Sequence, residues 1–241
     1  MNNMKNKPLV IIIAAIVALV LIGGGIAVYF VMNANKSAND KSALTAEPES
    51  KSEGTETVTP PGETGSTTAS TSEATGTPVQ TKEQDNNFGR LVTKDNFSLR
   101  VPDAWVETQA PTGVSLMLKN NSEQITNQAA KQIGFKSYLA VIRDNLGSNT
   151  IENYLSLSKD ALKQAIPGIT FAKEDSTSIG GRQAKVLEAD ISQQGINFKV
   201  LMFIISGENK EVWVISFNAL SENWNANKSL FYQIAWSFKL K

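Results

Sequence analysis

The 241-residue sequence contains no cysteine and no histidine. Without cysteine, the chain cannot form disulfide bonds, thiolate zinc sites, cysteine-ligated iron–sulfur clusters or a thiolate nucleophile. Without histidine, it lacks the side chain that most often acts as a general base near neutral pH and as a metal ligand. Any catalysis would therefore depend on carboxylate, lysine, serine, threonine or tyrosine groups. The lack of cysteine leaves the redox compartment open, but it suits a bacterial protein outside the cytoplasm.

The net charge is zero, because 23 basic side chains balance 23 acidic ones. The charges are distributed unevenly along the chain. Residues 33–87 hold nine acids and four lysines, a net charge of −5, whereas residues 88–241 hold 17 basic and 14 acidic side chains, a net charge of +3. The sequence contains no concentrated basic stripe of the kind that binds nucleic acid, so nucleic acid is not an expected partner.

Residues 9–32 form an uncharged run of 24 residues, LVIIIAAIVALVLIGGGIAVYFVM. A helix that rises about 1.5 Å per residue would cross a hydrocarbon core of about 30 Å over this length. The run exceeds the roughly 7–15 apolar residues of a signal peptide, and Asn33-Ala34-Asn35 is a poor cleavage site. We therefore predict an uncleaved transmembrane helix. A cleaved signal peptide is the alternative, and a lipoprotein is excluded because it requires cysteine.

Residues 1–8 are predicted to be a short cytoplasmic tail, because a short N-terminal tail usually stays inside while a large C-terminal part is translocated. The predicted location is the cell membrane, with one pass, a cytoplasmic N-terminus and an extracytoplasmic C-terminal domain.

Residues 33–87 contain no aromatic residue and are rich in serine, threonine, glutamate, glycine and proline. Such a segment cannot bury enough apolar surface to offset its chain entropy, so we predict a disordered linker with a reach of ~40 Å. Residues 88–241 carry 16 of the 18 aromatic residues and are long enough for one core. They are predicted to form the functional domain.

The pattern of this domain predicts both strands and helices. Thr150 is a candidate N-cap for a helix that ends at about Ile166, before Pro167-Gly168, and Gly180-Gly181 is typical of a tight hairpin turn. A polar stretch at 120–134 leaves room for a short helical turn. A second long helix is predicted from 221 to about 235. Strands are predicted at 97–101, 114–119, 137–143, 169–179, 182–192, 198–206 and 211–219.

The last two strands carry large apolar residues on both faces, with Trp213, Ile215 and Phe217 opposite Val212 and Val214. Strands of this kind lie in the centre of a sheet that is covered on both sides. The predicted fold class is α+β, a mainly antiparallel sheet flanked by helices in an α/β/α sandwich.

The domain resembles the PsbP-like, or Mog1/PsbP/DcrB-like, family. The resemblance rests on the segment FSLRVPDAW at 97–105, the strand SYLAVIRD at 137–144, the helix at 151–166, the Gly180-Gly181-Arg182 hairpin with its following strand pair, and a final helix that closes with Ser237-Phe238. It covers residues 88–241 and lies in the order and spacing of these segments.

The resemblance implies a noncatalytic fold. PsbP of photosynthetic organisms is an extrinsic photosystem II subunit that supports calcium and chloride retention, and many bacterial relatives are envelope proteins. The predicted anchor, the acidic linker and the lack of histidine depart from the plant form. They favour a bacterial envelope protein over a photosystem subunit.

Ser156 and Lys159 match the S-x-x-K spacing of serine acyl enzymes. The motif is short, no K-T-G partner is present, and it lies in a predicted amphipathic helix. We interpret it as a solvent-exposed helix face.

Five carboxylates could in principle converge as calcium ligands, although the sequence has no EF-hand loop. Ordinary carboxylates at strand ends and turns are the favoured interpretation. The five are Asp144, Glu174, Asp175, Glu188 and Asp190.

Four tryptophans could anchor a partner or a sugar, since aromatic side chains dominate many interfaces. Trp213, in a buried strand, and Trp224, on one helix face with Phe231, are predicted core residues. Trp105 follows a Pro-Asp turn and Trp236 is the fourth, and neither is assigned.

These observations predict a noncatalytic, membrane-anchored extracytoplasmic domain that binds or helps assemble a cell-envelope protein partner. The alternative is a small-molecule or calcium-binding module of the envelope, and a serine–lysine acyl enzyme is a remote one. No catalytic, cofactor-binding or metal-ligating residue is assigned, no cofactor is expected, and the binding surface is not located. The expected partners are the membrane, through residues 9–32, and an envelope protein.

Overall fold

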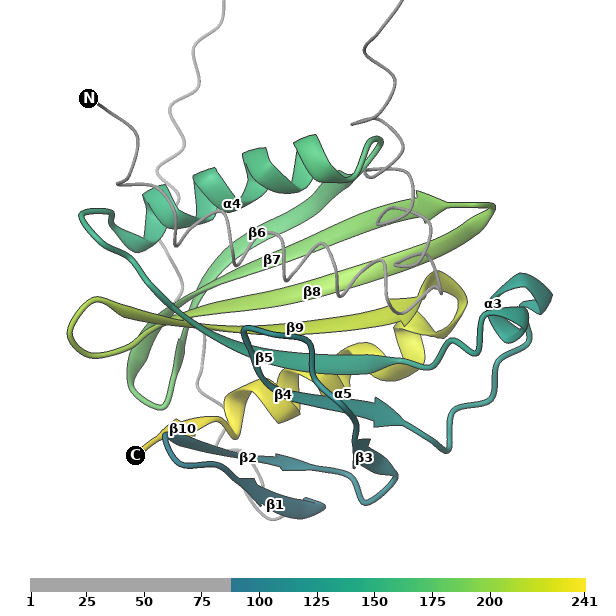
Figure 1. Cartoon of the computed structure of the whole chain (residues 1–241), viewed down its shortest axis with the longest axis horizontal. Coiled ribbons are helices and arrows are strands. Elements are labelled where there is room, and N and C mark those ends of the chain that lie inside the picture. Colours follow the sequence, from purple (N-terminus) through teal and green to yellow (C-terminus); the bar gives the residue numbers. More distant parts are fainter. Residues whose placement is uncertain (1–87) are drawn as a thin grey trace, which may run out of the picture.

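The computed structural model describes residues 88–241 (Figure 1). The predicted cytoplasmic tail at 1–8, transmembrane helix at 9–32 and linker at 33–87 lie outside the described residues. Among the helices of residues 88–241, none has the length and apolar character needed to span a bilayer.

A seven-stranded antiparallel sheet forms the centre of the domain, in the order β3-β4-β5-β9-β8-β7-β6. The long strands follow the predicted ones closely, and Gly180-Gly181 connects β6 and β7 as expected. The strands are β3 (Trp105–Glu107), β4 (Val114–Asn120), β5 (Tyr138–Asn145), β6 (Thr170–Ile179), β7 (Arg182–Gln193), β8 (Ile196–Ser206) and β9 (Glu211–Leu220).

A second, three-stranded sheet corrects the expectation of a single sheet. It contains β1 (Arg90–Thr93), β2 (Phe97–Val101) and β10 (Lys239–Leu240), in the order β1-β2-β10. The predicted strand at 97–101 therefore belongs to this small sheet. Its neighbours are too short to show a periodic pattern, since β10 has only two residues. The pairing of β10 with β2 also joins opposite ends of the domain sequence.

The two long helices cover opposite faces of the large sheet, as the sandwich prediction required (Figure 1). α4 (Ile151–Ala165) begins at the predicted cap, where the Thr150 hydroxyl oxygen accepts a hydrogen bond from the Asn153 amide over 3.2 Å. α5 (Trp224–Trp236) follows a 3-10 turn, η1 (Ser221–Asn223), so the predicted helix start at 221 is three residues early. The short α3 (Gln128–Gln132) lies in the polar stretch.

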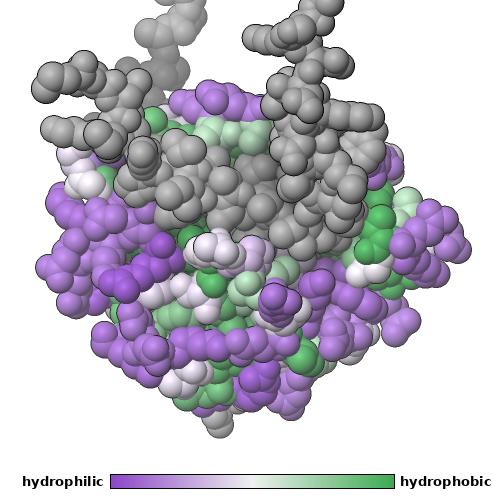
Figure 2. All heavy atoms as spheres, in the orientation of Figure 1, coloured by the Kyte–Doolittle hydropathy of each residue, from purple (hydrophilic) through white to green (hydrophobic). Residues whose placement is uncertain are grey.

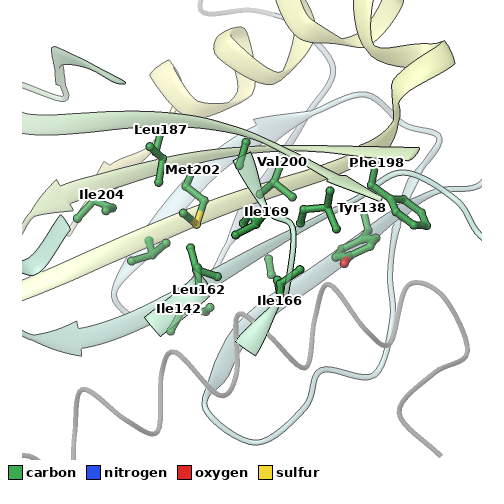
Figure 3. Packing of buried hydrophobic residues seen from close by; sticks show 14 of the residues in the cluster. Tyr138, Ile142, Leu162, Ile166, Ile169, Leu187, Phe198, Val200, Met202 and Ile204 are labelled. Atoms are coloured by element: carbon green, nitrogen blue, oxygen red, sulfur yellow. The ribbon is translucent and has the colours of Figure 1, made fainter. Parts of the chain in front are cut away.

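Two hydrophobic clusters fill the space on either side of the large sheet. On the α4 side, Leu162 packs in one cluster with Ile142 and Met202 of the sheet (Figure 3). On the α5 side, a second cluster contains Trp213 and Phe217 together with the inner residues of the small sheet. β9 supplies both clusters from alternate positions, which confirms the prediction of a strand buried on both faces.

Candidate functional site

Trp236 is the one tryptophan of the four that is exposed, with 37% of its surface accessible. Trp213 and Trp224 are buried, as predicted, and the Trp224 ring lies 6.0 Å from the Phe231 ring. Trp105 is buried as well. Three tryptophans therefore belong to the core and one remains available to a partner.

The S-x-x-K residues do not form a dyad. Ser156 is exposed on α4, and the Lys159 ammonium lies 2.7 Å from Glu174 Oε2 and 5.4 Å from the centre of the Phe171 ring. Within residues 88–241, no hydrogen bond connects Ser156 to Lys159. The structure supports the interpretation of this motif as a solvent-exposed helix face.

The five acidic residues weighed as calcium ligands are separated by the sheet. Their positions follow from strand register, because neighbouring strand residues point to opposite faces. Each carboxylate has its own local partner, and the described residues contain no group of three or more acidic side chains that could hold a metal ion. On the α4 face are Asp144, bonded to Tyr154, and Glu174, bonded to Lys159; on the α5 face are Asp175 with Lys173, Glu188 with Lys228, and Asp190 with Lys199.

Burial shifts the pKa of one of these carboxylates, Asp144, and of its hydrogen-bond partner Tyr154. Desolvation raises the pKa of Asp144 above its usual value, against the opposing effect of its hydrogen bonds. Desolvation also raises the pKa of Tyr154, and the nearby Asp144 charge adds to that shift. The pair is a packed contact between β5 and α4 rather than an open site.

Another buried carboxylate, Glu123, is explained by its structural contacts. Its Oε1 accepts hydrogen bonds from the Ser137 hydroxyl over 2.7 Å and from Asn223 Nδ2 over 2.9 Å, and its Oε2 accepts one from the Ser137 amide. These bonds connect the loop after β4 to the start of α5. Glu123 therefore holds two elements together and offers no free oxygen-rich site.

The hollows of the described domain include two that border β6 and β7. One lies between α4 and the β6–β7 strands and has a volume of about 150 Å³. Its rim carries charges that already pair, Lys159 with Glu174 and Lys185 with Glu152 at 3.1 Å. The hollow is lined by Glu152, Leu155, Ser156, Lys159, Glu174 and Lys185.

The other hollow has a volume of about 260 Å³ and lies between the β6–β7 hairpin and β10. We call it the C-terminal hollow. Both hollows are below the ~300–1,000 Å³ usual for small-molecule sites. The C-terminal hollow is lined by Ile179, Gly180, Arg182, Phe238, Lys239 and Leu240.

The hairpin turn lies close to the C-terminal strand because its residues are glycines. Gly180 and Gly181 have φ values of 58° and 77°, which glycine adopts without strain. A Cβ atom on Gly180 would stand 3.3 Å from the Phe238 carbonyl oxygen. The turn and β10 therefore form two walls of one hollow, although they are far apart in sequence.

Trp236 is the last residue of α5, two positions before Phe238 of this hollow in the sequence. Its ring is 5.4 Å from that of Tyr232, whose hydroxyl donates a hydrogen bond to Glu188 on β7 over 3.2 Å. This side of α5 thus faces the strands that form the hairpin. We call Trp236 together with the lining of the C-terminal hollow the C-terminal surface.

Elsewhere the surface has little apolar character on the face shown in Figure 2, where hydrophilic residues predominate and hydrophobic ones appear in small separate patches. The C-terminal surface was not located from the sequence. The glycine pair and the closing Ser237-Phe238 are separate features of the sequence, and no local pattern indicates that they meet.

No family model matches the sequence, and no curated protein matches it. Several solved structures are similar. LpqN of Mycobacterium tuberculosis, which is involved in cell envelope biogenesis, is 16% identical with a TM-score of 0.48 over 65% of this chain and 87% of that chain. The cyanobacterial PsbP, CyanoP, of Synechocystis is 16% identical with a TM-score of 0.48 over 62% and 89%.

The Ran-binding protein Mog1p of Saccharomyces cerevisiae is 10% identical with a TM-score of 0.43 over 60% of this chain and 89% of that chain. PsbP and Mog1 structures are thus among those similar to this chain, in agreement with the resemblance of its sequence. Likenesses of this extent concern the fold and carry no information about ligands or partners.

Proposed function

We propose that this chain is a membrane-anchored extracytoplasmic protein whose domain at 88–241 binds or helps assemble a protein partner of a bacterial envelope, without catalytic turnover. The observation that carries the proposal is the exposure of Trp236 at the end of α5, two residues before Phe238 of the C-terminal hollow. Tryptophan is among the residues that contribute most to protein interfaces when it is buried by a partner.

Trp236 leaves 37% of its surface in water, and a partner that covered this part would gain a share of the roughly 1.5–3 kcal/mol that complete burial of a large apolar side chain contributes. The C-terminal hollow is too small for most cofactors but adds concave apolar surface from Ile179, Phe238 and Leu240. An exposed aromatic ring two residues from the lining of such a hollow fits an interface centre.

The membrane part of the proposal rests on the hydropathy of residues 9–32, and the extracytoplasmic orientation rests on the short tail at 1–8. The acidic segment at 33–87 would then act as a spacer between the bilayer and the domain. A reach of ~40 Å lets the domain meet a partner that stands above the membrane surface.

Site-specific photo-cross-linking in the producing cells tests the partner-binding role. The photoreactive residue p-benzoylphenylalanine replaces Trp236 in the full chain, and in a control it replaces Leu157. Leu157 is a matched position because it is 38% exposed on α4, on the opposite face of the sheet.

We expect one envelope protein, identified by mass spectrometry, to be cross-linked from position 236 and not from position 157. Equal labelling from both positions, or none from position 236, would contradict the proposal.

A further inference from the structure

We infer that the partner presents an extended acidic segment, which pairs with the free edge of β10 and places one apolar side chain in the C-terminal hollow. The inference rests on the proposed function, because it concerns the same surface. It follows from the orientation of the β10 backbone, the apolar lining of the hollow and the two cations in that lining.

β10 is an edge strand, and in the described domain it pairs only with β2. The Lys241 amide donates a hydrogen bond to the Asn96 carbonyl oxygen of the β2 side over 3.1 Å. In an antiparallel pair, alternate residues direct their N–H and C=O groups toward the partner strand. Leu240 therefore directs both groups away from β2.

Those groups face the hollow. The Phe238 carbonyl oxygen, two residues earlier in the same alternation, points at the Gly180 turn. The backbone N–H and C=O groups of Leu240, two residues further along the strand, point in the same direction. An extended segment between β10 and the hairpin would thus find an unpaired donor and acceptor, which is the chemistry of strand addition to a sheet edge.

The lining of the hollow provides the place for a side chain. Ile179, Phe238 and Leu240 supply its apolar part. In strand addition, backbone hydrogen bonds contribute affinity and pockets for alternate side chains contribute specificity. A volume of about 260 Å³ suits one aliphatic or aromatic side chain rather than a whole ligand.

Two cations, Lys239 and Arg182, line the hollow and favour an acidic segment. The side chain of Lys239 has no hydrogen-bond or ion-pair partner among residues 88–241.

Arg182 pairs with the carboxylate of Glu208 at 2.8 Å, and the Glu208 side chain is 74% exposed. An exposed ion pair contributes little and can be exchanged. Complementary charge on a partner would increase the rate of encounter and set its specificity.

Selection from a phage-displayed random dodecapeptide library on the detergent-solubilised full chain tests the inference. We expect enrichment of peptides with a net negative charge and one central aliphatic or aromatic residue. N-methylation of the backbone at the central positions should abolish binding, because it removes the donors that pair with a strand edge.

Two charge reversals locate the site. Lys239→Glu should weaken the selected peptides about tenfold, and Lys131→Glu should leave them unchanged. Lys131 is a matched control because it is an exposed lysine on α3, at the opposite end of the domain (Figure 1). Circular dichroism melting of both variants checks that the fold is retained.

Enrichment of basic or helical peptides, or none, would overturn the inference. Binding to phosphatidylglycerol vesicles that depends on Lys239, without peptide enrichment, would overturn it in favour of a membrane surface. If position 236 still cross-links a partner in these cases, the proposed function stands and only the acidic-strand inference fails.

Discussion

Asp144 is a carboxylate buried against an uncharged donor. Only 8% of the residue is exposed, and the Tyr154 hydroxyl donates a hydrogen bond to its Oδ2 over 2.9 Å. Burial raises the pKa of Asp144. Because no cation pairs with it in residues 88–241, the charged form is less well accommodated than the neutral form in the folded state. Asp144 therefore makes stability depend on pH.

Asp144→Asn should reveal this dependence. A folded-state pKa above the unfolded value of about 3.9 means that the neutral carboxyl favours folding below that pH, and that this contribution is lost as pH rises through the folded-state pKa. The asparagine cannot ionise, so the variant does not lose this stability as pH rises, and its side-chain oxygen can still accept the Tyr154 hydrogen bond. Its free energy of unfolding, relative to the natural chain, should rise from pH 4 toward neutral pH.

Thermal melting of the full chain between pH 3 and pH 7 measures this difference. Tyr154→Phe should have the opposite effect and steepen the pH dependence, because it removes the side-chain donor to the carboxylate and leaves only the backbone bond from Asn145. A difference between Asp144→Asn and the natural chain that stays constant with pH would refute the assignment.

The β6–β7 hairpin and β10 depend on each other for their position. The turn glycines allow the hairpin to approach the C-terminal strand, and the Phe238 carbonyl lies at the contact. Phe238 itself is buried and packs on Phe97 and Trp213, with ring centres 5.4 Å and 6.0 Å away. The small sheet is thus held against the large one through aromatic contacts near the C-terminal surface.

A comparison of Gly180→Ala with Gly181→Ala distinguishes the cost of crowding the Phe238 carbonyl from the cost of backbone strain at positive φ. Both positions have positive φ, so either alanine should cost about 1 kcal/mol or more in free energy of unfolding. Only at Gly180 would the new Cβ press on the Phe238 carbonyl, at 3.3 Å, whereas at Gly181 no atom lies within 4 Å. Gly180→Ala should be the more destabilising, as measured by urea unfolding. Equal losses would show that the turn does not press on β10.

Long elements with a regular pattern were predicted well, and short ones were not. The α4 helix was anticipated from the Thr150 cap and the terminating Pro167, and β9 from its apolar residues on both faces. β1 and β10 have four and two residues, which is too few to show a period of two against the background. Their pairing with β2 is decided by contacts far along the chain.

The chain as a whole divides into parts of opposite charge and different hydropathy. The apolar run at 9–32, the acidic segment at 33–87 and the basic domain at 88–241 are contiguous blocks of composition. This arrangement underlies the proposal of a domain that is tethered outside the membrane, where its C-terminal surface is free to meet a partner.

Membrane anchoring by residues 9–32 predicts a clear fractionation result. The full chain should remain in the membrane pellet after alkaline carbonate extraction, and protease added to intact spheroplasts should digest the domain while sparing the cytoplasmic tail. A chain that lacks residues 1–32 should be recovered in the soluble fraction. Release of the full chain by carbonate would refute the anchor, and protection of the domain from protease would refute the orientation.

The sequence alone carries the division into three segments, the α+β class, the caps of α4 and the two-faced character of the central strands, because each depends on composition or on spacing within one segment. It also left the acidic residues and tryptophans as unsorted candidates. The folded domain separates the acids onto two faces, buries three tryptophans and leaves Trp236 exposed at the end of α5. The C-terminal surface is formed by residues around 180 and 238 that meet only when both sheets have packed, and no local periodicity encodes such a contact.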